Sequence, residues 1–147
     1  MYKDIKVLVV DDEKIVRDFF KRLLSLLGMD NMFAENGYKA IELVKNERFD
    51  LFFIDVRMPG LNGLDTYREI RKINPEAASV MITGYAVEEI LEQAKREGVY
   101  SAIRKPFDIN QIKDVIESRV IGLMEKVRGG EKNVFGKRSQ EQNSYLR

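Results

Sequence analysis

Leu51-Phe52-Phe53-Ile54-Asp55-Val56-Arg57-Met58-Pro59-Gly60 is the stretch of sequence that decides the fold. Its first four residues are bulky and apolar, which is typical of a strand that is buried on both faces. Asp55 follows them directly, and the Pro59-Gly60 pair is a turn signal that stops the strand from continuing. Asp55 is therefore predicted at the carboxyl end of a buried strand. Ligand sites form at that edge of a parallel sheet, because the loops that leave the strands diverge there.

The composition limits the classes of protein to which the chain can belong. The chain has 147 residues, enough for one ordinary domain with a real core, and its 25 Lys and Arg against 24 Asp and Glu leave a net charge of +1. No basic field suggests nucleic acid, and no apolar run approaches the ~20 residues of a membrane span. We therefore expect a cytoplasmic protein. The absence of Cys and His excludes disulfides, thiol nucleophiles and imidazole bases. Any metal would be held by oxygen, which favours Mg²⁺, Mn²⁺ or Ca²⁺.

Strand-like and helix-like segments alternate along the whole chain. Short apolar runs predict strands at residues 5–10, 32–34, 51–54, 79–83 and 100–103. Apolar stripes with helical spacing separate them, and a last one follows a capping box formed by Asp108 and Gln111. Right-handed crossovers turn this alternation into a parallel sheet. We predict a doubly wound, flavodoxin-like α/β fold with five parallel strands, five helices and three α/β/α layers.

The periodic pattern ends near residue 128. From Gly129 onward the sequence loses its apolar stripe and becomes polar and glycine-containing. We therefore expect one domain over residues 1–123, and over residues 124–147 a helix extension followed by a flexible tail or a truncated linker.

Charged or hydroxyl residues follow four of the five predicted strands. They are Asp11 and Asp12, Asp55, Thr83 and Lys105. Each alone has an ordinary explanation in helix capping, turn formation or solvation. In a parallel sheet, however, these strand ends lie on one edge, so the side chains should converge. Three carboxylates close together repel one another unless a cation lies among them, and Mg²⁺ would suit such a set. Asp55 is then the candidate nucleophile toward phosphorus.

Four blocks of sequence resemble the receiver domain of bacterial two-component response regulators, the chemotaxis-regulator-like family. They are VVDDE (9–13), FFIDVRMPGLNGLD (52–65), MITGYA (81–86) and IRKPF (103–107), and the resemblance covers about residues 4 to 123 in order and spacing. It implies that Asp55 accepts a phosphoryl group. The donor would be a histidine on a sensor histidine kinase or on a histidine phosphotransfer protein.

The resemblance also assigns the neighbouring residues. Asp12, Asp55 and the main-chain carbonyl of Arg57 would bind Mg²⁺ directly, with Mn²⁺ as a substitute, and Asp11 would act largely through water. Thr83 and Lys105 would hold the phosphoryl oxygens. The peptide bond between Lys105 and Pro106 is expected to be cis, which proline permits.

Switching in this family pairs the Thr83 position with an aromatic residue three positions before the lysine. Here that residue is Ala102, and Tyr100 lies on the same face but is displaced along the strand. We hypothesise that a smaller shift of the loop after the fourth strand suffices. Arg57 and Tyr85 correspond to positions that control access of water to the phosphate, and their size predicts slow hydrolysis.

Two alternatives to a signalling switch remain open at this stage. A Mg²⁺-dependent aspartyl-phosphate phosphohydrolase would also use a strand-end aspartate, but such enzymes resemble Asp-x-Asp, and Arg57 stands where their second acid would be. We therefore expect self-catalysed phosphotransfer and slow autodephosphorylation, without turnover of a substrate. The other alternative is an assembly module that works through its last helix, whose apolar stripe continues through Ile121, Leu123, Met124 and Val127. For the signalling switch, the partners also include a second copy of the chain, bound as a homodimer through the fourth and fifth helices, and we expect no direct contact with nucleic acid or membrane.

Overall fold

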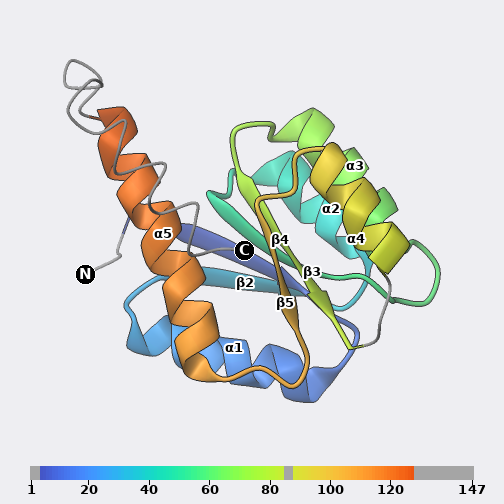
Figure 1. The fold of residues 1–147 in the computed structure, drawn as a ribbon, viewed down its shortest axis with the longest axis horizontal. Coiled ribbons are helices and arrows are strands. Elements are labelled where there is room, and N and C mark those ends of the chain that lie inside the picture. The colour runs from blue at the N-terminus through green and yellow to red at the C-terminus, as the bar shows by residue number, and fades with distance from the viewer. Residues whose placement is uncertain (1–3, 85–87, 128–147) are drawn as a thin grey trace. The chain divides into compact units, whose positions relative to one another are not determined.

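A computed structural model describes residues 4–84 and 88–127 of the chain, and Figure 1 shows its ribbon. The strands are β1 (Lys6–Val10), β2 (Asp30–Ala34), β3 (Leu51–Asp55), β4 (Ala78–Thr83) and β5 (Ser101–Arg104). The helices are α1 (Lys14–Leu26), α2 (Gly37–Asn46), α3 (Gly63–Ile73), α4 (Glu88–Arg96) and α5 (Ile109–Val127). The chain falls into two compact units, residues 1–106 and 107–147, and the first contains the whole sheet.

All five strands are parallel and lie in the order β2-β1-β3-β4-β5. The predicted doubly wound fold is therefore confirmed. The chain leaves β1 for β2 on one side and returns to β3 on the other, so the order reverses between β1 and β3. A crevice opens at the carboxyl ends of the strands at such a reversal. Asp55 is the last residue of β3, as the apolar run before it predicted.

The strands alternate their side chains between two apolar layers. Phe52 belongs to the core cluster on one face, where its ring lies 5.6 Å from that of Phe49. Phe53 points to the opposite face and its ring lies 4.8 Å from that of Phe20 in α1. Figure 1 shows α1 on one side of the sheet and α2, α3 and α4 on the other. Every residue of β3 is buried, which explains its continuous apolar sequence.

Local capping residues fix where the helices begin and end. Gly28 has φ 76°, a left-handed conformation that ends α1. Asn74 and Pro75 follow the last residue of α3, because the residue before a proline avoids the helical region. From the sequence alone, residues 35–37 predict a turn and Ala40 a brief helix after it, and the structure differs there. The helix begins at Gly37, since the side chain of Asn36 accepts a hydrogen bond of 2.8 Å from the N–H of Lys39.

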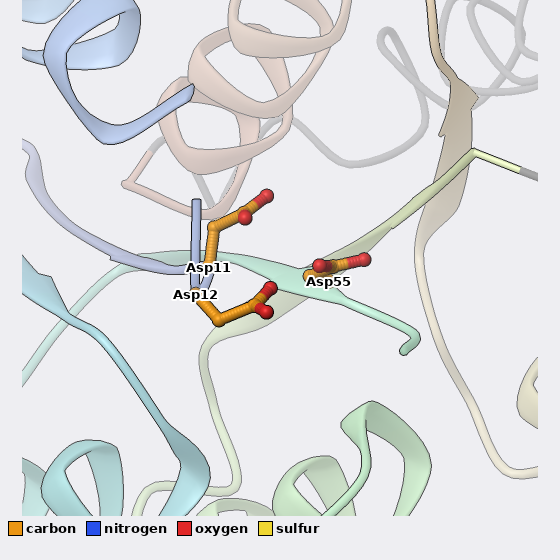
Figure 2. A group of neighbouring side chains, drawn as sticks. All are labelled: Asp11, Asp12 and Asp55. Atoms are coloured by element: carbon orange, nitrogen blue, oxygen red, sulfur yellow. The ribbon is translucent and has the colours of Figure 1, made fainter. Parts of the chain in front are cut away.

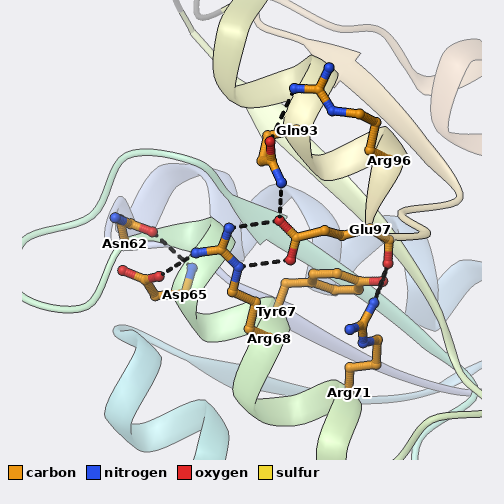
Figure 3. A network of polar contacts seen from close by, with 8 residues as sticks. All are labelled: Asn62, Asp65, Tyr67, Arg68, Arg71, Gln93, Arg96 and Glu97. Atoms are coloured by element: carbon orange, nitrogen blue, oxygen red, sulfur yellow. Dashed lines mark hydrogen bonds and ion pairs between the residues drawn. The ribbon is translucent and has the colours of Figure 1, made fainter.

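A polar network ties the end of α4 to α3 (Figure 3). Arg68 of α3 donates two hydrogen bonds to the Glu97 carboxylate, at 2.7 and 2.6 Å, and a third to Asp65 at 3.0 Å. The Tyr67 hydroxyl donates to the main-chain carbonyl of Glu97 at 2.7 Å. The hydrogen bond from Arg68 lowers the pKa of Glu97 to about 2, so this carboxylate stays ionised at any ordinary pH. The network fixes the C-terminal end of α4.

The second unit contains α5. The predicted capping box at its start is confirmed, because Asp108 Oδ1 accepts from the Gln111 N–H and Gln111 Oε1 accepts from the Asp108 N–H, both at 2.9 Å. The helix runs to Val127, and the predicted tail beyond it lies outside the described residues. Among the helices that the structure describes, none is both long and apolar enough to cross a bilayer.

Gly63 provides a test of how tightly α3 packs behind Asp55. A Cβ atom at this position would lie 2.2 Å from the main-chain oxygen of Asp55, and backbone cannot yield as a side chain end can. We expect Gly63→Ala to lower the free energy of unfolding by about 1–3 kcal/mol, measured by urea denaturation.

Gly122→Ala is the matched control for that substitution. Apart from its chain neighbours and the nearby backbone of its own helix, no described atom lies within 4 Å of a Cβ at Gly122, which is inside α5. This variant should gain about 0.5–1 kcal/mol, because alanine favours the helix over glycine. Equal effects of the two substitutions would refute the close approach at Gly63.

Candidate phosphoryl and metal site

Three aspartates meet at the carboxyl ends of β1 and β3. Asp11 and Asp12 follow β1 and Asp55 ends β3, and the pairing of Val10 with Ile54 makes these two strand ends adjacent. One carboxylate oxygen from each aspartate lies within 4.8 Å of the others. Figure 2 shows the three side chains gathered beside one another. Asp11 and Asp55 are 0% and 4% exposed, whereas Asp12 is open to solvent.

Lys105 brings a positive charge to this cluster from the loop after β5. Its Nζ lies 3.8 Å from Asp55 Oδ2, 3.3 Å from Asp11 Oδ2 and 2.8 Å from Glu13 Oε1. Burial alone would disfavour the charged ammonium, but these three acids raise the pKa of Lys105 above its ordinary value. The Lys105–Pro106 peptide bond is cis, as the resemblance implied. Lys105 is therefore charged and close to the buried acids.

Burial and mutual repulsion make ionisation of the two buried aspartates costly. Burial is the main cause that raises the pKa of Asp55 to about 7, and the charge of Asp11 adds to it. Lys105 and a 3.3 Å hydrogen bond from the Arg57 N–H act in the opposite direction. Burial also raises the pKa of Asp11. Near neutral pH these carboxylates therefore need more positive charge than Lys105 supplies.

The atoms of the cluster fit a hard divalent cation. Asp11 Oδ2 is fully buried and has no hydrogen-bond partner in the described part of the chain, although the Lys105 ammonium lies near it. A buried carboxylate oxygen without a well-directed hydrogen bond is costly, and metal coordination would add to the stabilisation that this ammonium provides. The donor set contains only oxygen, which suits Mg²⁺. Asp11, Asp12 and Asp55 are therefore the residues able to hold the ion, and the part expected of the Arg57 carbonyl stays a prediction.

The remaining predicted residues lie at or beyond the edge of this cluster. Thr83 ends β4 and is 2% exposed, and its main-chain carbonyl accepts a hydrogen bond of 2.7 Å from the Lys105 N–H. Ala102 lies exposed in β5, and Tyr100 comes just before that strand, where its N–H donates to the Ser79 carbonyl at 2.8 Å. Tyr85 lies outside the described residues. The switching and water-access roles of these residues stay predictions.

Sequence reasoning assigned no role to Glu13, the third acid after β1. Its carboxylate is the closest anion to Lys105 Nζ among the ion pairs found. Arg17 was also missed, and its guanidinium donates to the main-chain carbonyl of Asp11 at 2.8 Å. The only sequence signal for Glu13 is its place directly after two functional acids. Its contact with Lys105 spans 92 residues and could not be read from local pattern.

Comparison with known proteins identifies relatives of this site and fold. The family model of the response regulator receiver domain matches residues 7–117. Response regulator receiver protein Anae109_2439 of Anaeromyxobacter sp. (strain Fw109-5) is 37% identical over 113 residues, which are 75% of this chain and 46% of that protein. Sporulation initiation phosphotransferase F of Bacillus subtilis (strain 168) is 29% identical over 112 residues, 76% of this chain and 90% of that protein. The chain thus spans about half the length of the first relative and most of the second.

A solved structure shows the same architecture. The crystal structure of a response regulator receiver domain protein from Clostridium thermocellum superimposes with a TM-score of 0.76 and 29% identity, covering 82% of this chain and 97% of that one.

The raised pKa of Asp55 predicts how stability depends on pH without divalent metal. The Asp55 carboxyl binds its proton more tightly in the folded state than in the unfolded state, where its pKa is near 3.8. This difference stabilises the folded state fully below about pH 4. The stabilisation is lost as the pH rises through about 7. Asp55→Asn cannot ionise, so in EDTA it should be more stable than the parent at pH 8. The difference in free energy of unfolding between Asp55→Asn and the parent should be larger at pH 8 than at pH 5 by more than ~1.4 kcal/mol, which corresponds to one pKa unit.

Urea denaturation of both proteins at the two pH values checks this prediction. Asp18→Asn is the control, because Asp18 is an exposed acid of α1 whose pKa is lowered by its hydrogen bond from Lys14. An advantage of Asp55→Asn that does not change with pH would mean that Asp55 ionises normally in the folded protein.

Proposed function

Because this chain belongs to the response regulator receiver domain family, we propose that Asp55 is the residue through which it receives a phosphoryl group from a histidine kinase or a histidine phosphotransfer protein. One observation carries the proposal. The oxygens of Asp11, Asp12 and Asp55 lie within 4.8 Å of one another, and Lys105 Nζ is 3.8 Å from Asp55. A buried nucleophile, a place for a cation and a fixed ammonium are the parts that phosphoryl transfer needs.

The transfer itself is a displacement at phosphorus. A carboxylate oxygen of Asp55 attacks the phosphorus of a phosphohistidine in line, the O–P bond forms and the P–N bond breaks. The imidazole leaves with the electron pair of that bond and takes up a proton. Lys105 neutralises charge on the phosphoryl oxygens, and the Thr83 hydroxyl donates to one of them. Both groups lie on the same sheet edge as Asp55.

Mg²⁺, or Mn²⁺ in its place, would supply charge neutralisation of the attacking carboxylate and the phosphoryl oxygens when bound. Asp12, Asp55 and the main-chain carbonyl of Arg57 are its proposed direct ligands, with Asp11 acting largely through water. The fully buried Asp11 Oδ2, which lacks a hydrogen-bond partner among the described residues, supports a cation here.

The proposed role is that of a switch rather than an enzyme with a turnover substrate. We place the receiver domain at residues 1–123, which includes the match to residues 7–117, and the protein in the cytoplasm. Its output partner would be bound through the surface that phosphorylation changes, with a homodimer through α4 and α5 as one form. Arg57 and Tyr85 would slow loss of the phosphate by limiting the access of water.

The energy available from the phosphate suffices for switching. Moving a protein from 1% to 99% active requires about 5.5 kcal/mol. Two or three charge-assisted hydrogen bonds from Thr83 and Lys105, at about 1.5–3 kcal/mol each, reach that scale. With Ala102 in place of an aromatic residue, a small shift of the loop after β4 would carry the change.

Incubation with acetyl phosphate, a small phosphodonor, tests the proposal. With Mg²⁺ we expect the parent protein to gain one phosphoryl group per chain, measured by intact-protein mass spectrometry, because Asp55 accepts a single group and releases it slowly. Labelling should fall to background with EDTA or in Asp55→Asn.

Asp65→Asn is the matched control, since Asp65 is a half-exposed acid in the first turn of α3. It should label like the parent. Equal labelling of the parent and Asp55→Asn would remove Asp55 from its role. Release of many phosphates per chain would instead identify a phosphohydrolase.

A further inference from the structure

Glu13 and Lys105 form an ion pair at the rim of the phosphoryl site. Lys105 Nζ donates a hydrogen bond of 2.8 Å to Glu13 Oε1, whereas its distance to Asp55 Oδ2 is 3.8 Å. The Lys105 side chain is 19% exposed and that of Glu13 is 54% exposed. The ammonium is therefore held on the solvent side of the buried aspartates, nearer to Glu13 than to the proposed nucleophile.

The backbone holds Glu13 in place for this contact. The Glu13 N–H donates to Asp11 Oδ1 at 2.9 Å, and its carbonyl accepts from the N–H groups of Val16 and Arg17, both at 3.2 Å. Glu13 is the N-cap residue of α1, but its side chain makes no capping hydrogen bond. Its carboxylate is thus committed to Lys105 rather than to the helix.

Lys105 is anchored just as firmly at its main chain. Its N–H donates to the Thr83 carbonyl at 2.7 Å, so only the flexible side chain can move the ammonium. The Glu13 carboxylate draws Nζ away from Asp55, so it opposes movement of Nζ toward an oxygen of a phosphoryl group on Asp55. The Glu13 carboxylate and the phosphoryl oxygens compete for the same donor.

We propose that Glu13 is a positioning residue that holds the Lys105 ammonium away from Asp55 until a phosphoryl group displaces it, and so limits the rate of phosphorylation. The inference rests on the proposed function of Asp55. It assigns Glu13 a restraining effect on the reaction, because its contact with Lys105 stabilises the unphosphorylated state only. The free energy of a partly exposed ion pair of this kind corresponds to a factor of about 2–5 in an equilibrium constant.

The test is the rate of phosphorylation by acetyl phosphate at saturating Mg²⁺. Glu13→Gln should raise the rate constant about 2–5-fold, because the neutral amide holds the ammonium less strongly. Asp18→Asn makes the same change in net charge on the same helix, and Asp18 pairs with Lys14 rather than Lys105. It should leave the rate at the parent value.

Glu13→Asp separates the hydrogen bond from the charge. Aspartate keeps the negative charge, but its side chain is one methylene shorter and cannot reach Nζ at the same distance. If the contact with Lys105 limits the rate, Glu13→Asp will be accelerated like Glu13→Gln. If it reacts at the parent rate while Glu13→Gln is faster, repulsion of the anionic donor is the cause and the proposal is wrong.

A double-mutant cycle with Lys105→Met distinguishes release of the Lys105 ammonium from a general structural effect of Glu13→Gln. The acceleration by Glu13→Gln should disappear in the Lys105→Met background, because there is no ammonium to release. Persistence of the acceleration there, or a Glu13→Gln rate equal to or below that of the parent, would overturn the proposal. Failure of the parent to label on Asp55 is a different result, which would refute the proposed function itself.

Discussion

The burial of Asp11 and Asp55, two carboxylates at adjacent strand ends, is the constraint on which the rest of the site depends. Neither can ionise cheaply, because burial raises the pKa of both and the charge of Asp11 raises the pKa of Asp55 further. Lys105 offsets part of this cost from 3.3 and 3.8 Å. A divalent cation would offset the remainder, which supports the proposed metal site.

The scaffold keeps those charges together. The reversal of strand order between β1 and β3 makes their carboxyl ends neighbours, and buried apolar side chains on both faces of β3 fix its position. Gly63 lets the start of α3 approach the backbone of Asp55 closely. From the middle of α3, Arg68 pairs with Glu97 and holds the end of α4 (Figure 3).

The sheet and the convergence of the acids at its carboxyl edge could be predicted from the sequence, because both follow from local patterns of apolar and polar residues. The apolar run before Asp55 and the turn after it placed a strand end, and strand alternation placed the other acids on the same edge. Contacts between side chains that are far apart in the sequence could not be predicted from such local patterns. The Arg68–Glu97 pair depends on how α3 packs against α4, and the Glu13–Lys105 pair joins residues 92 positions apart. The start of α2 at Gly37 was not predicted, because it depends on one hydrogen bond that the Asn36 side chain accepts as the N-cap.

The most direct test of this account is the titration of the Asp55 side chain, followed by its carboxyl carbon resonance in a carbon-13 NMR spectrum. Without divalent metal the midpoint should lie near pH 7, because the carboxyl is buried beside Asp11. Saturating Mg²⁺ should lower the midpoint, because the ion binds the ionised carboxylate. A midpoint near 3.8 without metal, unchanged by Mg²⁺, would show that the acids do not oppose one another and that no cation is needed among them.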